Sequence, residues 1–331
     1  MPALPAVPAL LKTARHRLEW LVLSAAERSV PHLDRRAVLA LARVFGTLAY
    51  RLDYRGRTTA HQNLRAAFGP GLGDAGCARI ARASYRNMAR TAFDLFWISA
   101  LDRTTWHEHM RREIRGGGEP MTDPLAPSVL VTAHFGNFEW LAQAWGFAGQ
   151  PLLIIAQDFK NPLLTPIFSR LRSVSGNQII PQNRAVIRLM RHLKGGGRTA
   201  FLTDLTVKPS GAATVIRCFG LATCVTTTHA ELAARTGLPL VPCYGLPEPD
   251  GRYTMVAESA IRTDGLTVQQ VVQRCWDVYE QAIRQRPELW MWMYKHWRYI
   301  PPRSHGEYPP YANRSKRFDA LCAKSLPATS P

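Results

Sequence analysis

The sequence predicts an α/β fold: a single domain with a largely parallel central sheet flanked by helices, preceded by a helical N-terminal region. Three observations support this prediction. Residues 8–112 carry apolar side chains at three- and four-residue spacing, which is typical of amphipathic helices. From residue 128 onward, short strand-like runs alternate with helical runs, which favours strand–helix–strand units. With 331 residues, of which 46% are apolar, the chain can bury a large core.

The N-terminal region, residues 1–112, contains apolar helical faces interrupted by arginines. One face is formed by Leu18, Leu21 and Val22. A second face is formed by Val38, Leu41, Val44 and Phe45. None of the apolar runs reaches the length of a transmembrane helix. These faces fit an interfacial helix on an anionic membrane, and they fit ordinary helix packing about as well.

The α/β core is predicted over residues 113–301. Its strand-like runs are 128–133, 151–156, 178–180, 199–203, 213–218 and 239–244, with 253–257 possible. Its helix-like runs are 138–147, 162–174, 185–194, 227–236 and 268–284. This alternation indicates a mostly parallel sheet, because parallel strands need a long crossover connection that is usually a helix. Residues 302–331 are polar, basic and proline-containing, so we expect a basic, flexible tail there.

The chain is strongly basic: 42 Lys and Arg against 24 Asp and Glu give a formal net charge of +18. Such an excess indicates an acidic partner, either nucleic acid, an anionic membrane or an acidic protein. The basic residues are spread along the chain without a nucleic-acid-binding motif, which argues against nucleic acid. The six cysteines form no Cys-x-x-Cys pattern, so we expect reduced packing residues in a cytoplasmic compartment. We expect neither a metal nor a cofactor.

The strand-like run at 128–133 stops at a histidine, His134, and a turn at Gly136 and Asn137 leads into a helix that carries Glu139. In one continuous helix, a histidine and a glutamate at this spacing would lie about 140° apart. The two side chains meet only if His134 lies in the turn before the helix. That geometry suits a general base whose other ring nitrogen is held by Glu139. The alternative is a half-buried histidine with Glu139 as a solvated first-turn acid.

This His-x4-Glu pattern at a strand-to-helix turn resembles the glycerolipid and lysophospholipid acyltransferase superfamily. Four further segments resemble one branch of it, the bacterial lipid A late acyltransferases of the lauroyl and myristoyl type, whose relatives include mycobacterial phosphatidylinositol mannoside acyltransferases. The segments are Lys160-Asn-Pro with the later Arg172, the strand that ends at Asp204, Arg217-Cys-Phe-Gly with the threonine-rich turn after it, and the tryptophan-rich box at 287–301.

The sequence departs from the pattern of that branch in three places. Leu205 stands where glutamine is common, His229 stands where proline or a small residue is usual, and the tripeptide from Tyr294 replaces His-Arg-Arg. Lys295 and Arg298 keep positive charge in the last segment, which suits a phosphate or a lipid headgroup.

The resemblance implies transfer of a fatty acyl chain from an acyl carrier protein thioester, or from acyl-coenzyme A, to a hydroxyl group of a lipid A precursor. His134 is then the general base and Glu139 its orienting acid. Arg172 or backbone N–H groups near Gly136 stabilise the tetrahedral intermediate, and Asp204 positions Arg172 or the acceptor. The expected substrate-binding residues are Lys160, Asn137, Gly136, Lys295 and Arg298.

The resemblance also implies an apolar acyl pocket beside the His134 turn, to which Phe135, Phe138 and Trp140 are close in sequence. It implies peripheral attachment to an anionic membrane surface, the cytoplasmic face of the bacterial inner membrane, and no nucleic-acid partner. Two alternatives stay open: the same chemistry on a phosphatidylinositol mannoside or ornithine-type lipid, and a non-catalytic basic protein that binds membrane or nucleic acid. A hydrolase of the usual arrangement is disfavoured, because the sequence lacks Gly-x-Ser-x-Gly.

Overall fold

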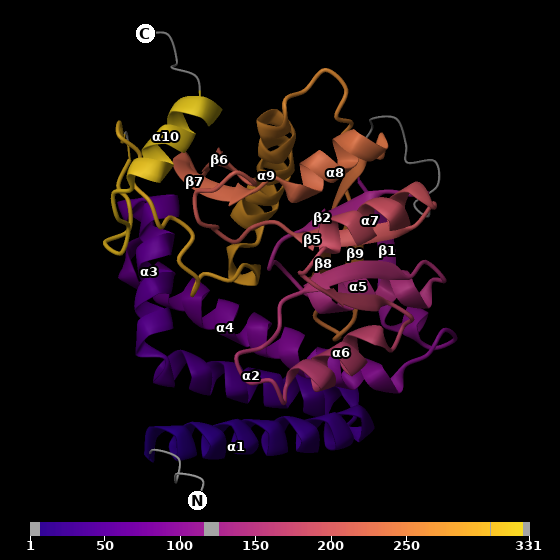
Figure 1. The fold of residues 1–331 in the computed structure, drawn as a ribbon. Coiled ribbons are helices and arrows are strands. Elements are labelled where there is room, and N and C mark those ends of the chain that lie inside the picture. The colour runs from indigo at the N-terminus through magenta and orange to yellow at the C-terminus, as the bar shows by residue number, and fades with distance from the viewer. Residues whose placement is uncertain (1–6, 116–125, 305, 327–331) are drawn as a thin grey trace, which may run out of the picture.

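A central sheet with helices on both faces organises the protein, and a group of N-terminal helices packs along one end of it (Figure 1). The computed structural model describes residues 7–115, 126–304 and 306–326. Within these residues the central sheet has seven strands in the order β1-β9-β8-β2-β5-β3-β4. All neighbouring strands are parallel except β8 and β9, which are antiparallel. The predicted α/β class with a largely parallel sheet is therefore confirmed.

The strands of the sheet correspond to the apolar runs of the sequence. They are β1 Met110–Ile114, β2 Val129–Thr132, β3 Leu152–Ala156, β4 Gln178–Pro181, β5 Arg198–Leu202, β8 Leu240–Pro247 and β9 Tyr253–Ala257. All four residues of β2 are buried because helices cover both faces of the sheet. Val129 and Val131 join one apolar cluster, whereas Leu130 joins the other. This alternation follows from the two-residue repeat of a strand.

Five helices flank the sheet. They are α5 Phe138–Phe147, α6 Thr165–Ser173, α7 Ala185–Lys194, α8 Thr228–Thr236 and α9 Val268–Gln285. Helices α7 and α8 lie on one face and α5 and α6 on the other (Figure 1). Side-chain caps define two of the starts. Asn137 accepts the backbone N–H of Trp140 at the start of α5, and Thr267 forms a capping box with Gln270 at the start of α9.

The N-terminal region is helical, as predicted, over most of its length. Its helices are α1 Val7–Ser29, α2 Arg35–Leu52, α3 Tyr54–Phe68 and α4 Gly73–Trp97. Asp34 and Asp53 cap α2 and α3 by accepting backbone N–H groups of the first turn. Helices α2 and α4 pack closely at Gly46, where a side chain would collide with the backbone of Arg86. Among the described helices, none is both long and apolar enough to cross a membrane.

Short 3₁₀ segments join several of these elements. They are η1 Val30–His32, η2 Pro70–Leu72, η3 Ile98–Ala100, η4 Trp106–Glu108 and η5 Pro287–Leu289. The last of them, η5, leads directly into the tryptophan-rich segment that begins at Trp290.

The structure differs from the sequence prediction in three places. Strand β1 forms within the end of the region predicted to be helical, and four of its five residues are exposed, so it has no apolar alternation to reveal it. Strand β6, Ala213–Cys218, is not part of the central sheet but pairs antiparallel with β7, Leu221–Thr226, which was not predicted.

The third difference concerns the predicted flexible tail. Helix α10, Lys316–Ser325, forms within it, so the expectation of a flexible tail is wrong for that segment. Phe318 is fully buried there against Ala213 and Val215 of β6, and this apolar contact gives the segment a fixed structure. The last five residues of the predicted tail, 327–331, lie outside the described residues.

Gly136 offers a direct test of how closely the turn after β2 packs. Its φ is +61°, and an added methyl group would collide with the carbonyl oxygen of Gly245 in β8. Gly149 has a similar φ of +80° but open space around the missing Cβ. We expect Gly149→Ala to lower the free energy of unfolding by about 1 kcal/mol and Gly136→Ala by about 3 kcal/mol or more, measured by urea denaturation. Equal losses in the two variants would contradict this close packing.

Candidate active site

Two polar side chains follow neighbouring strands of the sheet at the same edge. Strands β2 and β5 are parallel and in register, with Thr132 opposite Leu202. His134 follows β2 by two residues, and Asp204 follows β5 by two residues. Because the carboxyl ends of parallel strands meet at one edge, the pairing of β2 with β5 brings these side chains together.

Asp204 holds His134 by both its ring and its backbone. The distance from His134 Nδ1 to Asp204 Oδ1 is 2.7 Å, and the backbone N–H of His134 donates to Oδ2 at 2.9 Å. The indole N–H of Trp290 also donates to Oδ2, at 2.9 Å. A carboxylate only accepts hydrogen bonds, so Nδ1 of His134 carries the proton in this contact. In the neutral ring, Nε2 is then the free basic nitrogen.

Burial and charge shift the pKa values of this pair in opposite directions. Burial disfavours the charged imidazole, but the adjacent carboxylate outweighs that effect and raises the pKa of His134. Burial likewise opposes ionisation of Asp204, yet His134 and the Trp290 hydrogen bond lower its pKa to about 2. The carboxylate therefore stays ionised at neutral pH, and the imidazole becomes a stronger base than an isolated histidine.

Glu139 pairs with Arg172 and not with His134. Its carboxylate accepts from Arg172 Nε at 3.1 and 3.2 Å and also from Nη2. The predicted role of Glu139 as the orienting acid of His134 is therefore wrong: Asp204 makes that contact. Asn137 starts α5 one residue before Phe138, which places Glu139 in the first helical turn, where its carboxylate meets the last turn of α6. Asp204 contacts His134 and Trp290, so its predicted positioning of Arg172 is wrong, whereas its predicted positioning of the acceptor stays a prediction.

Gly136 and Asn137 shape the turn after β2. Both are buried, and Asn137 has no exposed surface. The N–H of Gly136 donates to the carbonyl of Leu289 at 3.0 Å, and that of Asn137 donates to the carbonyl of Gly245 at 2.8 Å. These two N–H groups are therefore paired within the protein. Substrate binding by the two residues, and stabilisation of an oxyanion by other N–H groups near Gly136, stay predictions. Their role in the turn depends on partners from distant segments.

A cavity of about 530 Å³ opens beside the His134 turn. Its ionisable lining residues are His134, Glu139 and Arg172, and the region around them is called the polar part of the cavity below. The remaining lining is largely apolar and includes Phe138, Ile154, Ile155, Val186, Phe201 and Leu202. The predicted apolar pocket is thus present in the structure. Of the three aromatic residues expected near it, Phe138 lines the cavity, whereas Phe135 and Trp140 are buried in the two apolar clusters.

The structure does not bring Lys160, Lys295 and Arg298 to the cavity lining. All three are exposed. The ammonium group of Lys295 lies 5.2 Å from the ring centre of Tyr311, and the guanidinium of Arg298 lies 4.9 Å from that of Tyr294. Their expected binding of a phosphate or headgroup stays a prediction.

Trp290 and His296 belong to the site but were not assigned a role from the sequence. The His296 ring stacks on Trp290 with ring centres 3.9 Å apart, and burial lowers the pKa of His296 to about 4. This histidine is therefore neutral at physiological pH and leaves the Asp204 charge to His134. The tryptophan-rich box was the available signal, although apolar packing explains the burial of Trp292 and Trp297 equally well.

The comparison with protein families places the chain in one family. The family model described as "Bacterial lipid A biosynthesis acyltransferase" matches residues 8–299, a range that contains His134, Glu139, Arg172 and Asp204. The chain therefore belongs to the bacterial lipid A biosynthesis acyltransferase family. No individual curated protein matches the chain. Among the described residues, no group of three or more His, Cys, Asp or Glu side chains is arranged to hold a metal ion.

The opposite pKa shifts predict how Asp204→Asn changes stability with pH. The pKa of His134 is raised, so its contribution to stability is present at low pH and is lost as pH rises through that pKa. The pKa of Asp204 is lowered from 3.8 to about 2, so its contribution is complete above the first value and is lost as pH falls through the second. We expect Asp204→Asn to cost about 2 kcal/mol near pH 5.5 and less at pH 9 and at pH 2. Urea denaturation at the three pH values measures this. A cost that is the same at all three would contradict the ion pair.

Proposed function

We propose that this family member transfers a fatty acyl chain from a thioester, carried by acyl carrier protein or coenzyme A, to a hydroxyl group of a lipid A precursor or related membrane glycolipid. The observation that carries the proposal is the contact of His134, which lines a largely apolar cavity, with the buried carboxylate of Asp204. A base strengthened by a buried carboxylate suits removal of a proton from a hydroxyl group. An apolar cavity beside that base suits a hydrocarbon chain.

In this proposal His134 is the general base. Its Nε2 takes the hydroxyl proton as the acceptor oxygen attacks the thioester carbonyl carbon. The carbon–oxygen bond forms, the carbon–sulfur bond breaks, and the proton passes from the imidazolium to the departing thiolate. The Asp204 carboxylate stabilises the imidazolium in between. General-base assistance of this kind typically contributes about 10²–10⁴-fold to the rate. No covalent acyl-enzyme is required, because the thioester is already activated.

Arg172 supplies positive charge at the polar part of the cavity. Its side chain is a quarter exposed, and Glu139 fixes it with paired hydrogen bonds. We assign Arg172 the stabilisation of the oxyanion of the tetrahedral intermediate, and Glu139 the task of holding Arg172 in place. A preorganised cation in a water-poor site stabilises developing negative charge more strongly than one in water.

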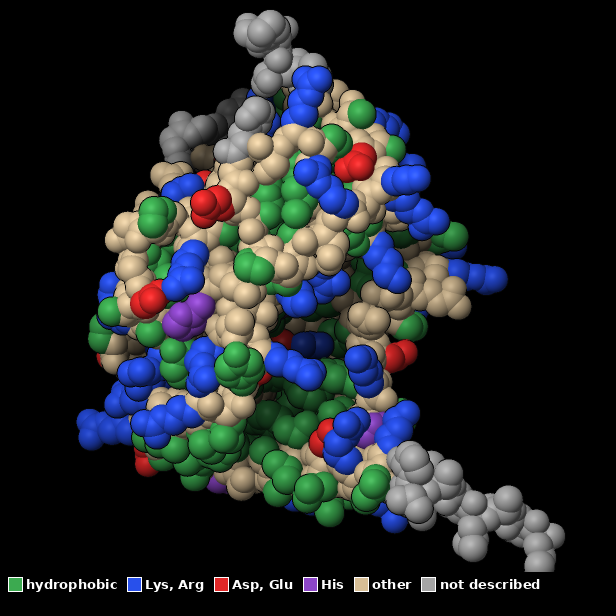
Figure 2. All heavy atoms as spheres, turned by 90° about the vertical axis from the view of Figure 1, so that its left-hand side faces the viewer, with side chains coloured by type: hydrophobic (Ala, Val, Ile, Leu, Met, Phe, Trp, Pro, Cys, Tyr) green, Lys and Arg blue, Asp and Glu red, His purple; other side chains and the backbone are tan. Residues whose placement is uncertain are grey.

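The N-terminal helices supply a surface that suits a membrane. Exposed large apolar side chains on α1 and α2 are Leu11, Leu18, Trp20, Leu21, Val22, Val44, Phe45, Leu48 and Leu52. Figure 2 shows hydrophobic side chains gathered low on the molecule, where α1 and α2 lie, below a hollow bordered by Lys and Arg side chains. Together with the net charge of +18, this supports peripheral attachment to an anionic membrane, the cytoplasmic face of the inner membrane.

The reaction itself can be tested with purified variants. The protein is incubated with labelled acyl carrier protein thioester and a lipid A precursor, and the product is identified by mass spectrometry. We expect His134→Ala to lower kcat by at least about 10²-fold and the exposed His107→Ala to leave it unchanged. Acyl transfer that survives His134→Ala would contradict the mechanism. Transfer to a phosphatidylinositol mannoside or ornithine-type lipid, but not to the lipid A precursor, would contradict the proposed acceptor.

Membrane attachment predicts that exposed apolar residues of α2 matter for vesicle binding. Burial of a side chain of this size contributes about 1–2 kcal/mol, so we expect Val44→Ser with Leu48→Ser to weaken binding to phosphatidylglycerol vesicles at least about 10-fold. The control is Ile114→Ser, which removes an equally exposed apolar residue from β1. Vesicle sedimentation measures both. If the two proteins bind vesicles equally well, α2 is not the membrane surface.

A further inference from the structure

Helix α4 carries a buried polar stripe that faces the turn from His134 to Asn137. Its members are Ser84, Asn87, Thr91 and Asp94, at the three- and four-residue spacing that places side chains on one helical face. Each is at most 7% exposed. Buried polar groups need hydrogen-bond partners, so these side chains are expected to bond to the segments packed against α4.

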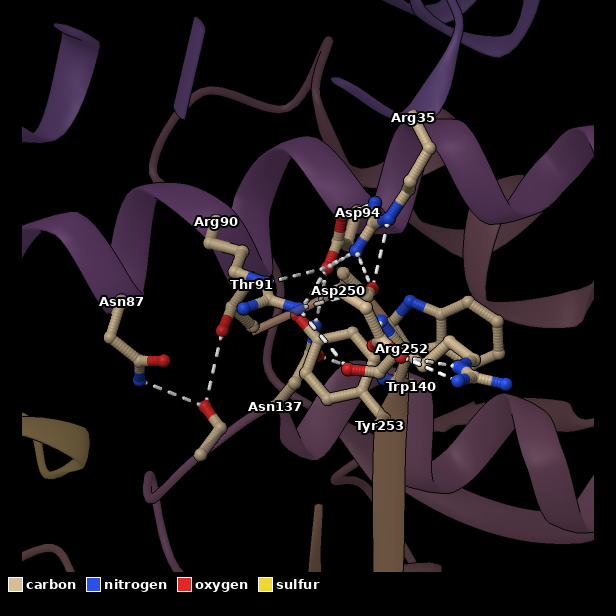
Figure 3. Close-up of polar contacts among 12 residues, drawn as sticks. Arg35, Asn87, Arg90, Thr91, Asp94, Asn137, Trp140, Asp250, Arg252 and Tyr253 are labelled. Atoms are coloured by element: carbon tan, nitrogen blue, oxygen red, sulfur yellow. Dashed lines mark hydrogen bonds and ion pairs between the residues drawn. The ribbon is translucent and has the colours of Figure 1, made fainter. Parts of the chain in front are cut away.

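Two members of the stripe bind the backbone of the turn at Gly136. The Asn87 side-chain amide donates to the carbonyl of Gly136 at 3.0 Å and to that of Leu289 at 3.0 Å. The Thr91 hydroxyl donates to the same Gly136 carbonyl at 3.2 Å. Gly136 lies two residues after His134, so α4 contacts the chain immediately beside the proposed base. Figure 3 shows Asn87 and Thr91 on α4.

Asp94 lies at the end of the stripe and has no exposed surface. Its carboxylate accepts hydrogen bonds from the guanidinium of Arg35 and from the hydroxyl of Tyr253. Arg90 Nε lies 3.9 Å from its Oδ2 atom. The side-chain amide of Asn137 donates to the same carboxylate at 3.0 Å. Figure 3 shows these groups converging on Asp94 from different elements. A buried carboxylate is stable only when it is paired and hydrogen-bonded, so this arrangement fixes Asn137 in one orientation.

We infer that Asp94 is a positioning residue for acyl transfer: through Asn137 it fixes the start of α5, and with it the placement of His134 and Glu139. The Asn137 side chain uses its amide group for Asp94 and its oxygen to cap α5 at Trp140. His134 precedes Asn137 by three residues and Glu139 follows it by two. Movement of Asn137 therefore displaces both the base and the carboxylate that holds Arg172. This inference rests on the proposed function for its kinetic consequence only.

The first experiment reads the position of His134 without any substrate. The pKa of its ring is measured by NMR in full-length protein with labelled histidine, assigned with His134→Asn. Asn137→Ser keeps a helix-capping oxygen and the net charge but loses the contact with Asp94. We expect the pKa of His134 to fall by about 0.5 unit or more, because its close contact with Asp204 is loosened. The control is Thr267→Ala, which removes the cap of α9; it is expected to lower Tm and leave the pKa unchanged.

The second experiment is a double-mutant cycle on kcat with Asp94→Asn and Asn137→Ser. We expect each variant to lower kcat about 10-fold with KM within about twofold, and the double variant to be no slower than either single variant. Effects that multiply to about 100-fold would overturn the inference, because Asp94 would then act independently of Asn137. An unchanged pKa of His134 in both folded single variants would also overturn it. Absence of acyl transfer by the wild type would reject the proposed function and leave the NMR result standing.

Discussion

The site depends on keeping the Asp204 carboxylate ionised inside the protein. A buried charge is stable only with hydrogen bonds and opposite charge around it. Strand pairing between β2 and β5 brings His134 to the carboxylate, and the segment after η5 brings Trp290. The sheet, the His134 turn and the tryptophan-rich segment thus satisfy one electrostatic requirement, and that requirement fixes the tautomer and raises the basicity of His134.

The other two buried carboxylates near the turn have separate tasks. Glu139 holds Arg172 beside the cavity, whereas Asp94 holds Asn137 behind the turn. Each of the three carboxylates contacts a guanidinium or imidazole group directly: Asp94 contacts Arg35, Asp204 contacts His134, and Glu139 contacts Arg172. His134 and Arg172 are thus held by different carboxylates, Asp204 and Glu139. In the proposed mechanism this separation is needed, since the base must be neutral while the oxyanion needs positive charge.

Local patterns predicted much of the fold, and long-range contacts account for most of the errors. The predicted runs 138–147 and 185–194 coincide with α5 and α7, and the turn after 128–133 places His134 where the pattern required. The identity of its carboxylate partner depended on the sheet order, because Asp204 lies 70 residues away while Glu139 is close in sequence. Gly136 and Asn137 were recognised as turn residues, but their buried partners on α4 and β8 belong to segments that sequence spacing does not relate to them.

The most direct test of the account is an NMR titration of His134 in the wild type, Asp204→Asn and Glu139→Gln. The pKa of His134 is raised mainly by its direct contact with Asp204, with Glu139 as a more distant charge. We therefore expect a clear fall in the pKa of His134 in Asp204→Asn and a smaller fall in Glu139→Gln. A larger fall in Glu139→Gln, with Asp204→Asn close to the wild type, would contradict the assignment of Asp204 as the partner of the base.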